Sequence, residues 1–555
     1  MRICGIKASH DGGVAVIEDG RLLFSHEIEK LRNGERYSSL GDVERVTEIL
    51  AAEGLSPVDI DQFVVDGWYT KNAEGEPAVE VRAGGVPVPL RVAPYVERPG
   101  DRPLQRHTFS GHGFDGYASY PHVANHLVGT YCSSPFAARG EDALVLVWDG
   151  IITPRLYRVA AATREVTFVE ALMPVFGGSF AAFCARFEPF LRETDDDMSS
   201  DRFIRHHLSV AGKAMAYAAQ GRVESGAFAV FDDLMAEFRG IPVDRVGALG
   251  DKVAANRDEL MPGLSNADLI ATYQAYLGHR LLERLISVVR GRFPDGGHNL
   301  VLGGGCALNI KWNTAIRACG VFREVFVPPF PNDAGAAIGT AACEMFRRGR
   351  RALEWNVYSG PRLTTGALPD GWRAQPCDER QLAVLLHTGD EPVVVLSGRA
   401  ELGPRALGNR SILAPATGSR MKDRLNDIKN RARYRPVAPI CLADRAPEVF
   451  DPGIPDPYMI FEHRMRPGWA ERVPAVVHLD GTARLQTIAS TQDTATARIL
   501  AAYAELSGIP VLCNTSANLE GRGFFPDVES AARWGGTRHI WSEGTLYTNR
   551  RPVRE

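Results

Sequence analysis

The stretch RICGIKASHDGGVAVIEDGRLLF, residues 2–24, decides how the first half of the chain folds. Apolar residues recur through residues 2–8, Asp11-Gly12-Gly13 can form a turn, and Val14–Ile17 is rich in β-branched residues. Leu22–Phe24 resumes the apolar pattern after Asp19–Gly20, a dipeptide typical of two-residue hairpin turns. The stretch therefore predicts three consecutive strands at the start of the chain.

A related pattern returns in residues 143–172. Ala143–Trp148 is an apolar strand that ends in Asp149–Gly150, and two further strands are predicted at residues 154–159 and 166–172. Two three-stranded starts, each with an acidic-glycine turn after its first strand, favour a duplicated architecture such as the actin-like fold, in which two halves enclose a nucleotide. Asp-Gly turns are common, so a chance repeat is the alternative.

Length and composition indicate a globular protein of several domain-sized units, because the 555 residues are 45% hydrophobic and 23% charged. The net charge of -4 gives no general case for a nucleic-acid partner. No apolar run is long enough to span a membrane, and the N-terminus fails as a secretory signal. The nine scattered cysteines, none in a CxxC pair, fit reduced thiols and a cytoplasmic protein.

A glycine run, Gly303–Gly305, follows the predicted strand Asn299–Leu302 and precedes a helix that begins near Ala307. Glycine at a strand-to-helix turn lets backbone amides approach a phosphate closely, although the run alone is weak evidence. Helices are expected between about residues 200 and 290, and the irregular residues 347–377 are interpreted as a connection between domains.

His122 and His126 stand four residues apart, a spacing that places both imidazoles on one helical face where they can share a metal ion. Asp333, between a strand and a helix, is a candidate third ligand that only the fold could bring near. Two imidazoles and one carboxylate would suit Fe(II), Zn or Mn. The alternative is a pair of core or surface histidines without a metal.

Two further polar segments are candidates for chemistry. His10–Asp11 follows the first strand, where a histidine could act as a general base or merely cap a turn. Residues 514–518, Asn-Thr-Ser-Ala-Asn, follow a buried strand, as ligand loops and ordinary turns both do.

Residues 398–439 carry ten lysines and arginines against three acids. A solvated basic helix face is one interpretation. However, Gly-Pro-Arg-Ala-Leu-Gly sets Arg405 between turn formers, which favours a fixed guanidinium for an anionic ligand.

Several of these segments together resemble the O-carbamoyltransferases of antibiotic biosynthesis and nodulation. They are SHDGGVAVIEDG at 9–20, the paired His122 and His126, GGGCALN at 303–309, PNDAGAAIG at 331–339, GPRALGNRSILA at 403–414, NDIKNRARYRPVAP at 426–439 and VLCNTSAN at 511–518. The resemblance spans nearly the whole chain, and the N-terminus and the C-terminal end look most like the 3-hydroxymethylcephem carbamoyltransferases.

The resemblance implies an α/β protein of two domains. Residues 1–350 would form a duplicated actin-like domain similar to that of the tRNA threonylcarbamoyl-transfer enzymes, residues 351–378 a linker, and residues 379–555 a YrdC-like α/β domain. In the family, carbamoyl phosphate and ATP give carbamoyl-adenylate in the C-terminal domain, and the N-terminal domain transfers the carbamoyl group to a hydroxyl of a small natural product.

Site residues are implied in the same way, with ATP, Mg and Fe(II), or another divalent metal, as cofactors. His10 with Asp11 would be catalytic, taking the proton from the acceptor hydroxyl, and residues 67–119 would shape the acceptor site. His122, His126 and Asp333 would bind the metal. Asp149, Gly150, Lys213, Gly304, Gly305 and Asn309 would bind the nucleotide, and Arg405, Arg410, Lys429, Arg435, Asn514 and Ser516 would bind carbamoyl phosphate.

The sequence departs from the family pattern at three places, and two other functions are considered. AMAYAAQG follows Lys213 where many members have a Gly-Leu-Ala-Pro-Tyr-Gly-like loop, Cys306 replaces an aliphatic residue, and Ala517 replaces an aromatic one. A tRNA-modifying or hydrogenase-maturation carbamoyl enzyme is disfavoured because the chain lacks CxxC fingers and a basic face. A non-catalytic actin-like nucleotide-binding module is the third interpretation, and the acceptor and the oligomeric state stay open.

Overall fold

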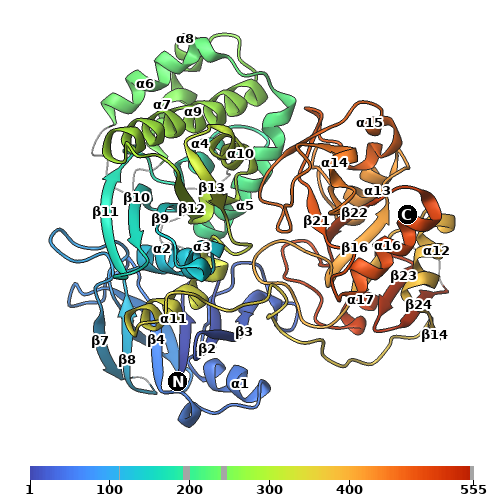
Figure 1. Ribbon diagram of the computed structural model, residues 1–555, viewed down its shortest axis with the longest axis horizontal. Coiled ribbons are helices and arrows are strands. Elements are labelled where there is room, and N and C mark those ends of the chain that lie inside the picture. Colours follow the sequence, from blue (N-terminus) through green and yellow to red (C-terminus); the bar gives the residue numbers. More distant parts are fainter. Residues whose placement is uncertain (112, 192–200, 239–246, 551–555) are drawn as a thin grey trace. The chain divides into compact units, whose positions relative to one another are not determined.

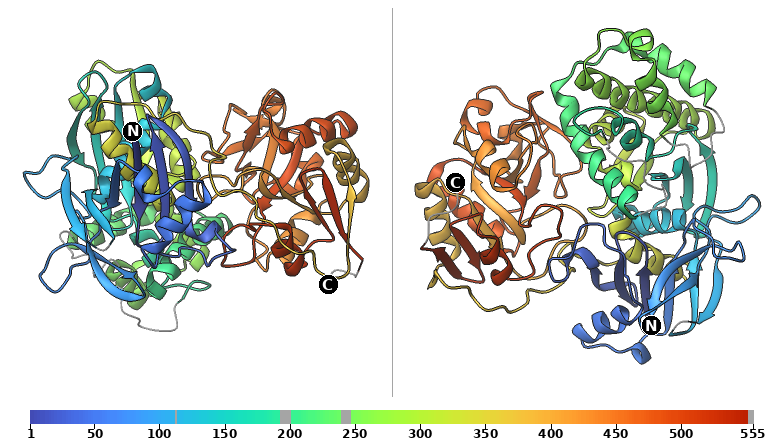
Figure 2. Two further views of the ribbon diagram at one scale, coloured as in Figure 1. Left: turned by 90° about the horizontal axis from the view of Figure 1, so that it is seen from below. Right: turned by 180° about the vertical axis from the view of Figure 1, so that it is seen from behind.

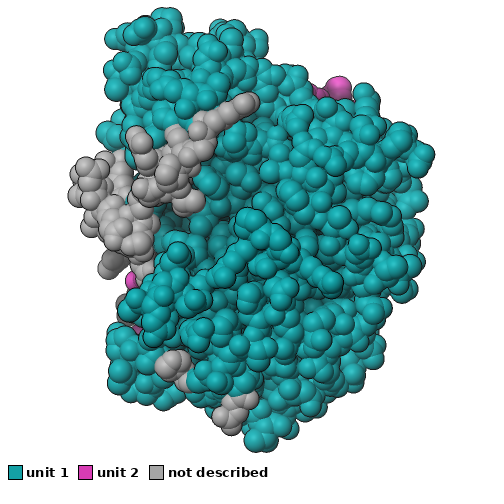
Figure 3. Space-filling model, turned by 90° about the vertical axis from the view of Figure 1, so that its left-hand side faces the viewer, with its two compact units in different colours: residues 1–23, 39–355 teal, residues 24–38, 356–555 magenta. Residues whose placement is uncertain are grey.

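The computed structural model describes residues 1–111, 113–191, 201–238 and 247–550. The chain divides into two compact units, which Figure 3 colours separately. Unit 1 consists of residues 1–23 and 39–355, and unit 2 consists of residues 24–38 and 356–555. Each unit is built around its own sheets.

Unit 1 begins with a six-stranded sheet in the order β3-β2-β1-β4-β8-β7. β1 runs antiparallel to β2 and parallel to β4, and β4 runs parallel to β8. The strands are β1 (Arg2–Lys7), β2 (Gly13–Glu18), β3 (Arg21–Glu27, whose last residues belong to unit 2), β4 (Gln62–Asp66), β7 (His107–Gly111) and β8 (Phe114–Tyr120).

A second, five-stranded sheet repeats this arrangement in the order β11-β10-β9-β12-β13. β9 is antiparallel to β10 and parallel to β12, which is parallel to β13. The strands are β9 (Ala143–Asp149), β10 (Ile152–Ala160), β11 (Glu165–Ala171), β12 (His298–Gly303) and β13 (Phe322–Phe326). The duplicated three-stranded start predicted from residues 2–24 and 143–172 is therefore present in the topology.

Two helices lie between these sheets, as Figures 1 and 2 show. α11 (Ala336–Arg347) packs on β1, β2 and β4, α2 (His122–Cys132) packs on β9 and β12, and the two helices pack on each other. Glycine permits this contact, because a Cβ atom on Gly129 would lie 2.5 Å from the Cα atom of Gly339. The helix pair thus brings residues of both halves into one layer.

Replacement of Gly129 by alanine is expected to force α2 and α11 apart and to lower the stability of unit 1 by about 1–3 kcal/mol, as overpacking does. Gly212, within α5 (Asp201–Tyr217), is the matched control, because its Cβ atom would meet nothing within 4 Å. Gly212→Ala should raise stability slightly. Thermal unfolding of both variants measures the difference, and equal melting temperatures would contradict the close packing.

The remaining elements of unit 1 surround this core. The helices predicted between residues 200 and 290 are present, with α9 as the longest, and a two-stranded hairpin, β5-β6, lies within residues 67–119. These elements are α1 (Glu44–Ala52), β5 (Ala78–Ala83), β6 (Val86–Arg91), α3 (Pro135–Arg139), α4 (Ser179–Cys184), α6 (Phe228–Glu237), α7 (Ala248–Ala255), α8 (Arg257–Leu260), α9 (Asn266–Arg292) and α10 (Ile310–Ala318).

Unit 2 contains an eight-stranded mixed sheet in the order β14-β24-β23-β15-β16-β22-β17-β21. The helices α12 and α16 pack on each other and against strands of this sheet. The strands are β14 (Trp372–Pro376), β15 (Val393–Leu396), β16 (Arg410–Pro415), β17 (Ala438–Leu442), β21 (Gln486–Ile488), β22 (Val511–Ser516), β23 (His539–Ser542) and β24 (Thr545–Asn549). The helices are α12 (Glu379–Gly389), α13 (Met421–Ile428), α14 (Ala446–Val449), α15 (Trp469–Arg472), α16 (Ala495–Ser507) and α17 (Val528–Trp534). A small sheet of β18 (Phe450–Asp451), β19 (His463–Met465) and β20 (Thr482–Ala483) accompanies it.

The unit boundaries differ from the ranges expected from the sequence. Residues 356–378 belong to unit 2, where β14 pairs with β24, so the expected linker contributes an edge strand. Residues 24–38 also belong to unit 2 because the Lys30 ammonium binds the carbonyl oxygens of Glu401 and Gly403. Neither contact has a local sequence signal. In the described residues, no helix is long and apolar enough to cross a membrane.

Candidate functional site

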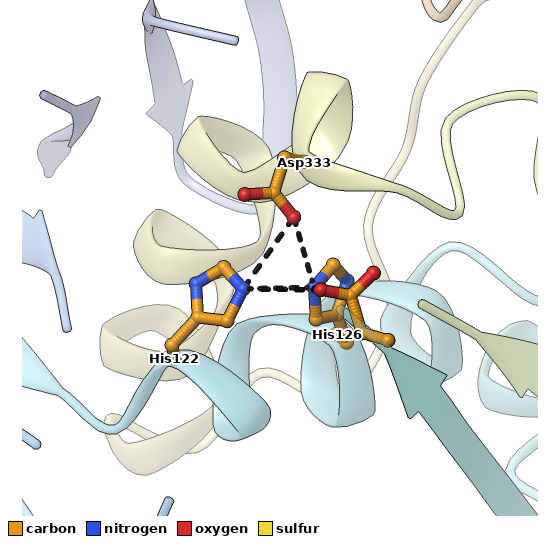
Figure 4. A group of neighbouring side chains, drawn as sticks. His122, His126 and Asp333 are labelled. Atoms are coloured by element: carbon orange, nitrogen blue, oxygen red, sulfur yellow. Dashed lines mark hydrogen bonds and ion pairs between the residues drawn. The ribbon is translucent and has the colours of Figure 1, made fainter. Parts of the chain in front are cut away.

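Four buried side chains of unit 1 form a candidate metal centre. Their ligand atoms all lie within 4.8 Å of one another, and the residues are His122, His126, Asp149 and Asp333. Figure 4 shows the two histidines on the first turns of α2 and Asp333 just before α11. Asp149 is the last residue of β9. The duplicated fold therefore joins the three predicted ligands, and Asp149, predicted as a nucleotide contact, lies with them.

The donor atoms of this centre fit a divalent cation. The Nδ1 atom of His126 lies 3.1 Å from the Pro331 carbonyl oxygen, which can only accept a hydrogen bond, so the proton resides on Nδ1. The Nδ1 atom of His122 lies 2.7 Å from the Asp66 carboxylate. Both Nε2 atoms then turn lone pairs toward each other across 3.2 Å, with Asp333 Oδ1 at 3.4 and 3.3 Å. Two lone pairs and a carboxylate face one point, and a cation there would relieve their repulsion.

Electrostatics leads to the same conclusion. Burial opposes ionisation of Asp333, but the Lys7 ammonium together with His122 and His126 outweighs it, and the pKa of this carboxyl lies well below its usual range. Burial also opposes charge on His122, whereas Asp66 favours it and the pKa of His122 is raised well above its ordinary value. The buried carboxylates thus demand a positive charge between them, supplied either by protons or by a metal ion.

His10 and Asp11 lie beside this centre, directly after β1. The Nδ1 atom of His10 is 2.8 Å from Asp11 Oδ2, and its Nε2 atom is 3.7 Å from Asp333 Oδ2. A carboxylate on Nδ1 orients the ring and leaves Nε2 to exchange a proton. This arrangement suits the predicted general base.

Aromatic side chains enclose the same region, and the sequence did not single them out. Tyr95 stacks on the His122 ring at 4.3 Å and donates to Asp149 Oδ2 at 3.2 Å. Trp68 packs edge-on against His10 and Tyr95. Both residues come from the segment 67–119, for which the sequence indicated only a role in acceptor binding.

The glycine run closes one side of the centre. Gly304 has φ +85° and a Cβ atom there would lie 2.3 Å from the Trp148 carbonyl oxygen, so only glycine fits. Its amide donates to the Pro331 carbonyl, and the Gly305 amide donates to Asp149. The Asn309 side-chain oxygen caps α10 by accepting from Lys311 and Trp312 amides. Gly304 and Gly305 therefore form the wall beside Asp149, and Asn309 fixes the start of the helix that follows them.

Gly150 and Lys213 are the other two residues predicted to bind the nucleotide. Gly150 follows Asp149 directly, and its carbonyl accepts from the Gly178 amide. Lys213 lies half-buried on α5. Their contacts with a nucleotide stay predictions.

Unit 2 contains a second candidate site, a cluster of basic side chains defined here as the basic cluster. Its members are Arg36, Arg405, Lys429, Arg431, Arg435 and Arg484. Burial first and repulsion from other members second lower the pKa of all of them except Arg36, which acts on its neighbours. Burial is the first cause for Arg405, followed by repulsion from Arg484, Arg36 and Arg435, and its pKa falls well below the usual range. Burial and Arg431 with Arg435 likewise lower the pKa of Arg484 to about 10.

Unsatisfied hydrogen-bonding atoms accompany this charge. The Nε atoms of Arg405 and Arg484 and the Oδ1 atom of Asn514 are buried and have no hydrogen-bond partner among the described residues. Buried polar atoms in native proteins are normally paired. Concentrated, mutually repelling cations with spare donors point to an anionic ligand such as a phosphate.

The predicted residues of this site differ in what they contact. Arg410 is almost fully buried, and its guanidinium donates to the carbonyl oxygens of Ser397, Gly398, Asn409 and Pro361. Arg410 therefore stabilises the loop before β16, and its guanidinium donors are satisfied by backbone carbonyl oxygens. Lys429 donates to the Ser516 carbonyl at 2.7 Å and also binds Asn518, whose Oδ1 accepts from the Ser516 hydroxyl.

Arg36 and Arg484 were missed by sequence reasoning. Arg36 follows β3, far from the basic stretch, and the Arg36 amide donates to the Gly521 carbonyl, which anchors its segment in unit 2. Arg484 lies between β20 and β21, outside every quoted motif. An isolated arginine gives no sequence signal, so only the structure could identify Arg36 and Arg484 as members of the basic cluster.

Comparison with known families accounts for most of the chain. Residues 2–343 match the family described as "Carbamoyltransferase N-terminus", and residues 384–540 match "Carbamoyltransferase C-terminus". The two matches fall in unit 1 and unit 2, apart from residues 24–38.

Individual relatives are similar over nearly their full lengths. Nodulation protein U of Sinorhizobium fredii is 46% identical over 99% of both chains. The 3'-hydroxymethylcephem-O-carbamoyltransferase of Streptomyces clavuligerus is 34% identical over 97% of both. Identity is thus higher to this nodulation relative than to the cephem enzyme, although the sequence motifs favoured the cephem branch. Among solved structures, the activator of the 2-hydroxyisocaproyl-CoA dehydratase from Clostridium difficile with bound ADPNP covers 63% of this chain and 96% of its own, at 16% identity and a TM-score of 0.33.

Proposed function

The chain belongs to the carbamoyltransferase family and is a carbamoyltransferase, and from this premise we propose the two-step reaction that it catalyses. Carbamoyl phosphate, one water molecule and ATP give carbamoyl-adenylate in unit 2, a YrdC-like domain, with release of phosphate and pyrophosphate. Unit 1, an actin-like domain, then transfers the carbamoyl group to a hydroxyl of a small natural product and releases AMP. The basic cluster, with its unpartnered buried donors, is the observation that carries this proposal.

In unit 2, the ligand is carbamoyl phosphate with the phosphates of ATP. Arg405, Arg435 and Arg484 hold phosphoryl oxygens, and Lys429 binds beside Ser516. One water molecule hydrolyses carbamoyl phosphate, which releases phosphate and leaves carbamate. A carbamate oxygen then attacks the α-phosphorus of ATP and displaces pyrophosphate. Fixed cations in a site shielded from bulk solvent stabilise the negative charge that develops on the phosphoryl oxygens. Mg accompanies ATP in this step.

In unit 1, His10 takes the proton from the acceptor hydroxyl as that oxygen attacks the carbamoyl carbon, and AMP leaves. The orientation of His10 by Asp11 supports this role. His122, His126, Asp149 and Asp333 would hold a divalent metal, and a donor set of two imidazoles and carboxylates would suit Fe(II). When bound, the metal supplies a Lewis acid that polarises the carbamoyl carbonyl.

The nucleotide portion of the adenylate lies near the wall formed by the glycine run. Gly304 and Gly305 contact Asp149 and Gly150 follows it, and Asn309 and Lys213 would complete the nucleotide contacts. The acceptor enters beside Trp68 and Tyr95, which come from the segment 67–119. The names of the relatives, a nodulation protein and a cephem carbamoyltransferase, support an acceptor among hydroxylated secondary metabolites.

Incubation of the protein with carbamoyl phosphate, ATP, Mg and a panel of hydroxylated metabolites tests this function. We expect pyrophosphate release in the presence of both substrates and a product heavier by one carbamoyl group. Omission of either carbamoyl phosphate or ATP should stop pyrophosphate release. Binding of ATP without pyrophosphate under all conditions would instead favour a non-catalytic nucleotide-binding module.

A further inference from the structure

Two buried residues behind the metal centre are not accounted for by the ligand set. Lys7, the last residue of β1, is 1% exposed, and Asp66, the last residue of β4, is 4% exposed. β1 and β4 are parallel neighbours, so their carboxyl ends meet at one edge of the sheet. A lysine and an aspartate so far from water need a specific reason to be there.

Asp66 contacts the ligand His122 from behind. Its Oδ2 atom lies 2.7 Å from His122 Nδ1 and 3.0 Å from Lys7 Nζ, while its Oδ1 atom accepts from Asn125 Nδ2 at 2.6 Å. Both carboxylate oxygens are thus fixed. A carboxylate on Nδ1 selects the tautomer whose Nε2 lone pair faces the metal and raises the basicity of the ring.

Lys7 contacts the ligand Asp333 in the same manner. Its Nζ atom lies 2.8 Å from Asp333 Oδ2, whereas the other oxygen, Oδ1, faces the two histidines. The ammonium also lies 4.5 Å from the centroid of the Trp68 ring, which favours a cation at that point. Lys7 therefore occupies one oxygen of Asp333 and leaves a single oxygen for a metal.

The net charge of the metal centre and the two residues behind it is consistent with a divalent cation. Asp66, Asp149 and Asp333 are three carboxylates, and Lys7 supplies one positive charge, so two positive charges are missing. A divalent cation supplies that number when both imidazoles are neutral. Without Lys7, the same carboxylates would leave a buried negative charge beside a divalent ion.

We propose that Lys7 and Asp66 are positioning residues of the metal centre. Asp66 holds His122 with Nε2 toward the metal, and Lys7 restricts Asp333 to binding through one oxygen, which keeps a coordination position open for substrate. This inference rests on the metal site of the proposed function and adds to it two residues that do not touch the metal.

Titration of the metal-free full-length protein with Co(II) alone tests the inference without any assay of activity. Asp66→Asn should bind Co(II) about 10–100-fold more weakly than the wild type, the usual loss when a residue behind a metal ligand is replaced. Lys7→Met should bind Co(II) with a weaker visible absorption, because a second oxygen of Asp333 raises the coordination number. Lys7→Gln, whose amide donates without charge, serves if Lys7→Met does not fold.

The matched control is Lys30→Met, which removes a buried lysine that is ion-paired with Glu27 in unit 2 and should leave both the affinity and the spectrum of Co(II) unchanged. Wild-type affinity in Asp66→Asn together with a wild-type spectrum in the folded Lys7 variant would overturn the positioning roles and leave the metal site intact. Absence of Co(II) binding by the wild type would instead overturn the metal site and this inference together.

Discussion

Arg405→Ala is expected to lower the formation of carbamoyl-adenylate by about 10²–10³-fold, the loss that follows removal of one group that stabilises developing charge. Its guanidinium lies in the basic cluster with a buried Nε atom that has no partner among the described residues. Pyrophosphate release from carbamoyl phosphate and ATP measures this step directly. Transfer from chemically supplied carbamoyl-adenylate should persist, since that step belongs to unit 1.

Stability separates this effect from misfolding. Burial and the neighbouring Arg484, Arg36 and Arg435 disfavour the charge on Arg405, so its removal relieves repulsion in the folded state. Arg405→Ala should therefore melt at the same temperature as the wild type or above it. A lower melting temperature with unchanged pyrophosphate release would show that Arg405 is structural.

Arg424→Ala is the matched control for this prediction. Arg424 belongs to the same basic stretch but lies exposed on α13, where its side chain contacts the Asp390 carbonyl. An exposed contact of this kind contributes little. We expect wild-type rates of both steps, and an equal loss in Arg424→Ala and Arg405→Ala would indicate a general charge effect.

His126→Ala is expected to lower carbamoyl transfer by a similar factor while pyrophosphate release continues. The variant removes one of two Nε2 lone pairs that face Asp333, so the remaining donors hold a divalent cation poorly. Metal content by elemental analysis and transfer from supplied carbamoyl-adenylate are the two measurements. Metal content and the rate of carbamoyl transfer should decrease together.

His279→Ala provides the control for His126→Ala. His279 lies half-exposed on α9, where it pairs with Glu283, away from the four metal-site residues. Its replacement should leave metal content and transfer unchanged. If His126→Ala retained full metal content and full transfer, the buried histidines would be structural and the metal centre would be wrong.

The features that the sequence predicted correctly depend on residues close together in the chain. The two Asp-Gly turns indicated the duplicated sheets, and the spacing of His122 and His126 placed both rings on one face of α2. The resemblance added Asp333. These predictions succeeded because each depends on turn chemistry, helical period or a long motif.

Features that depend on contacts between distant segments were not predicted. Asp149 joins the histidines because α2, which carries them, packs on β9, whose last residue is Asp149. Arg36 enters unit 2 only because residues 24–38 pack there. Arg410 shows the opposite case, since its motif suits an anion but its guanidinium is satisfied by four carbonyl oxygens.

The central claim is that adenylate formation and carbamoyl transfer use separate sites in the two units. Lys429→Ala and His10→Ala, each assayed for pyrophosphate release and for transfer from supplied carbamoyl-adenylate, test it most directly. The account predicts that Lys429→Ala loses the first activity and keeps the second, and that His10→Ala does the reverse. Loss of the same step in both variants would contradict the division into two sites.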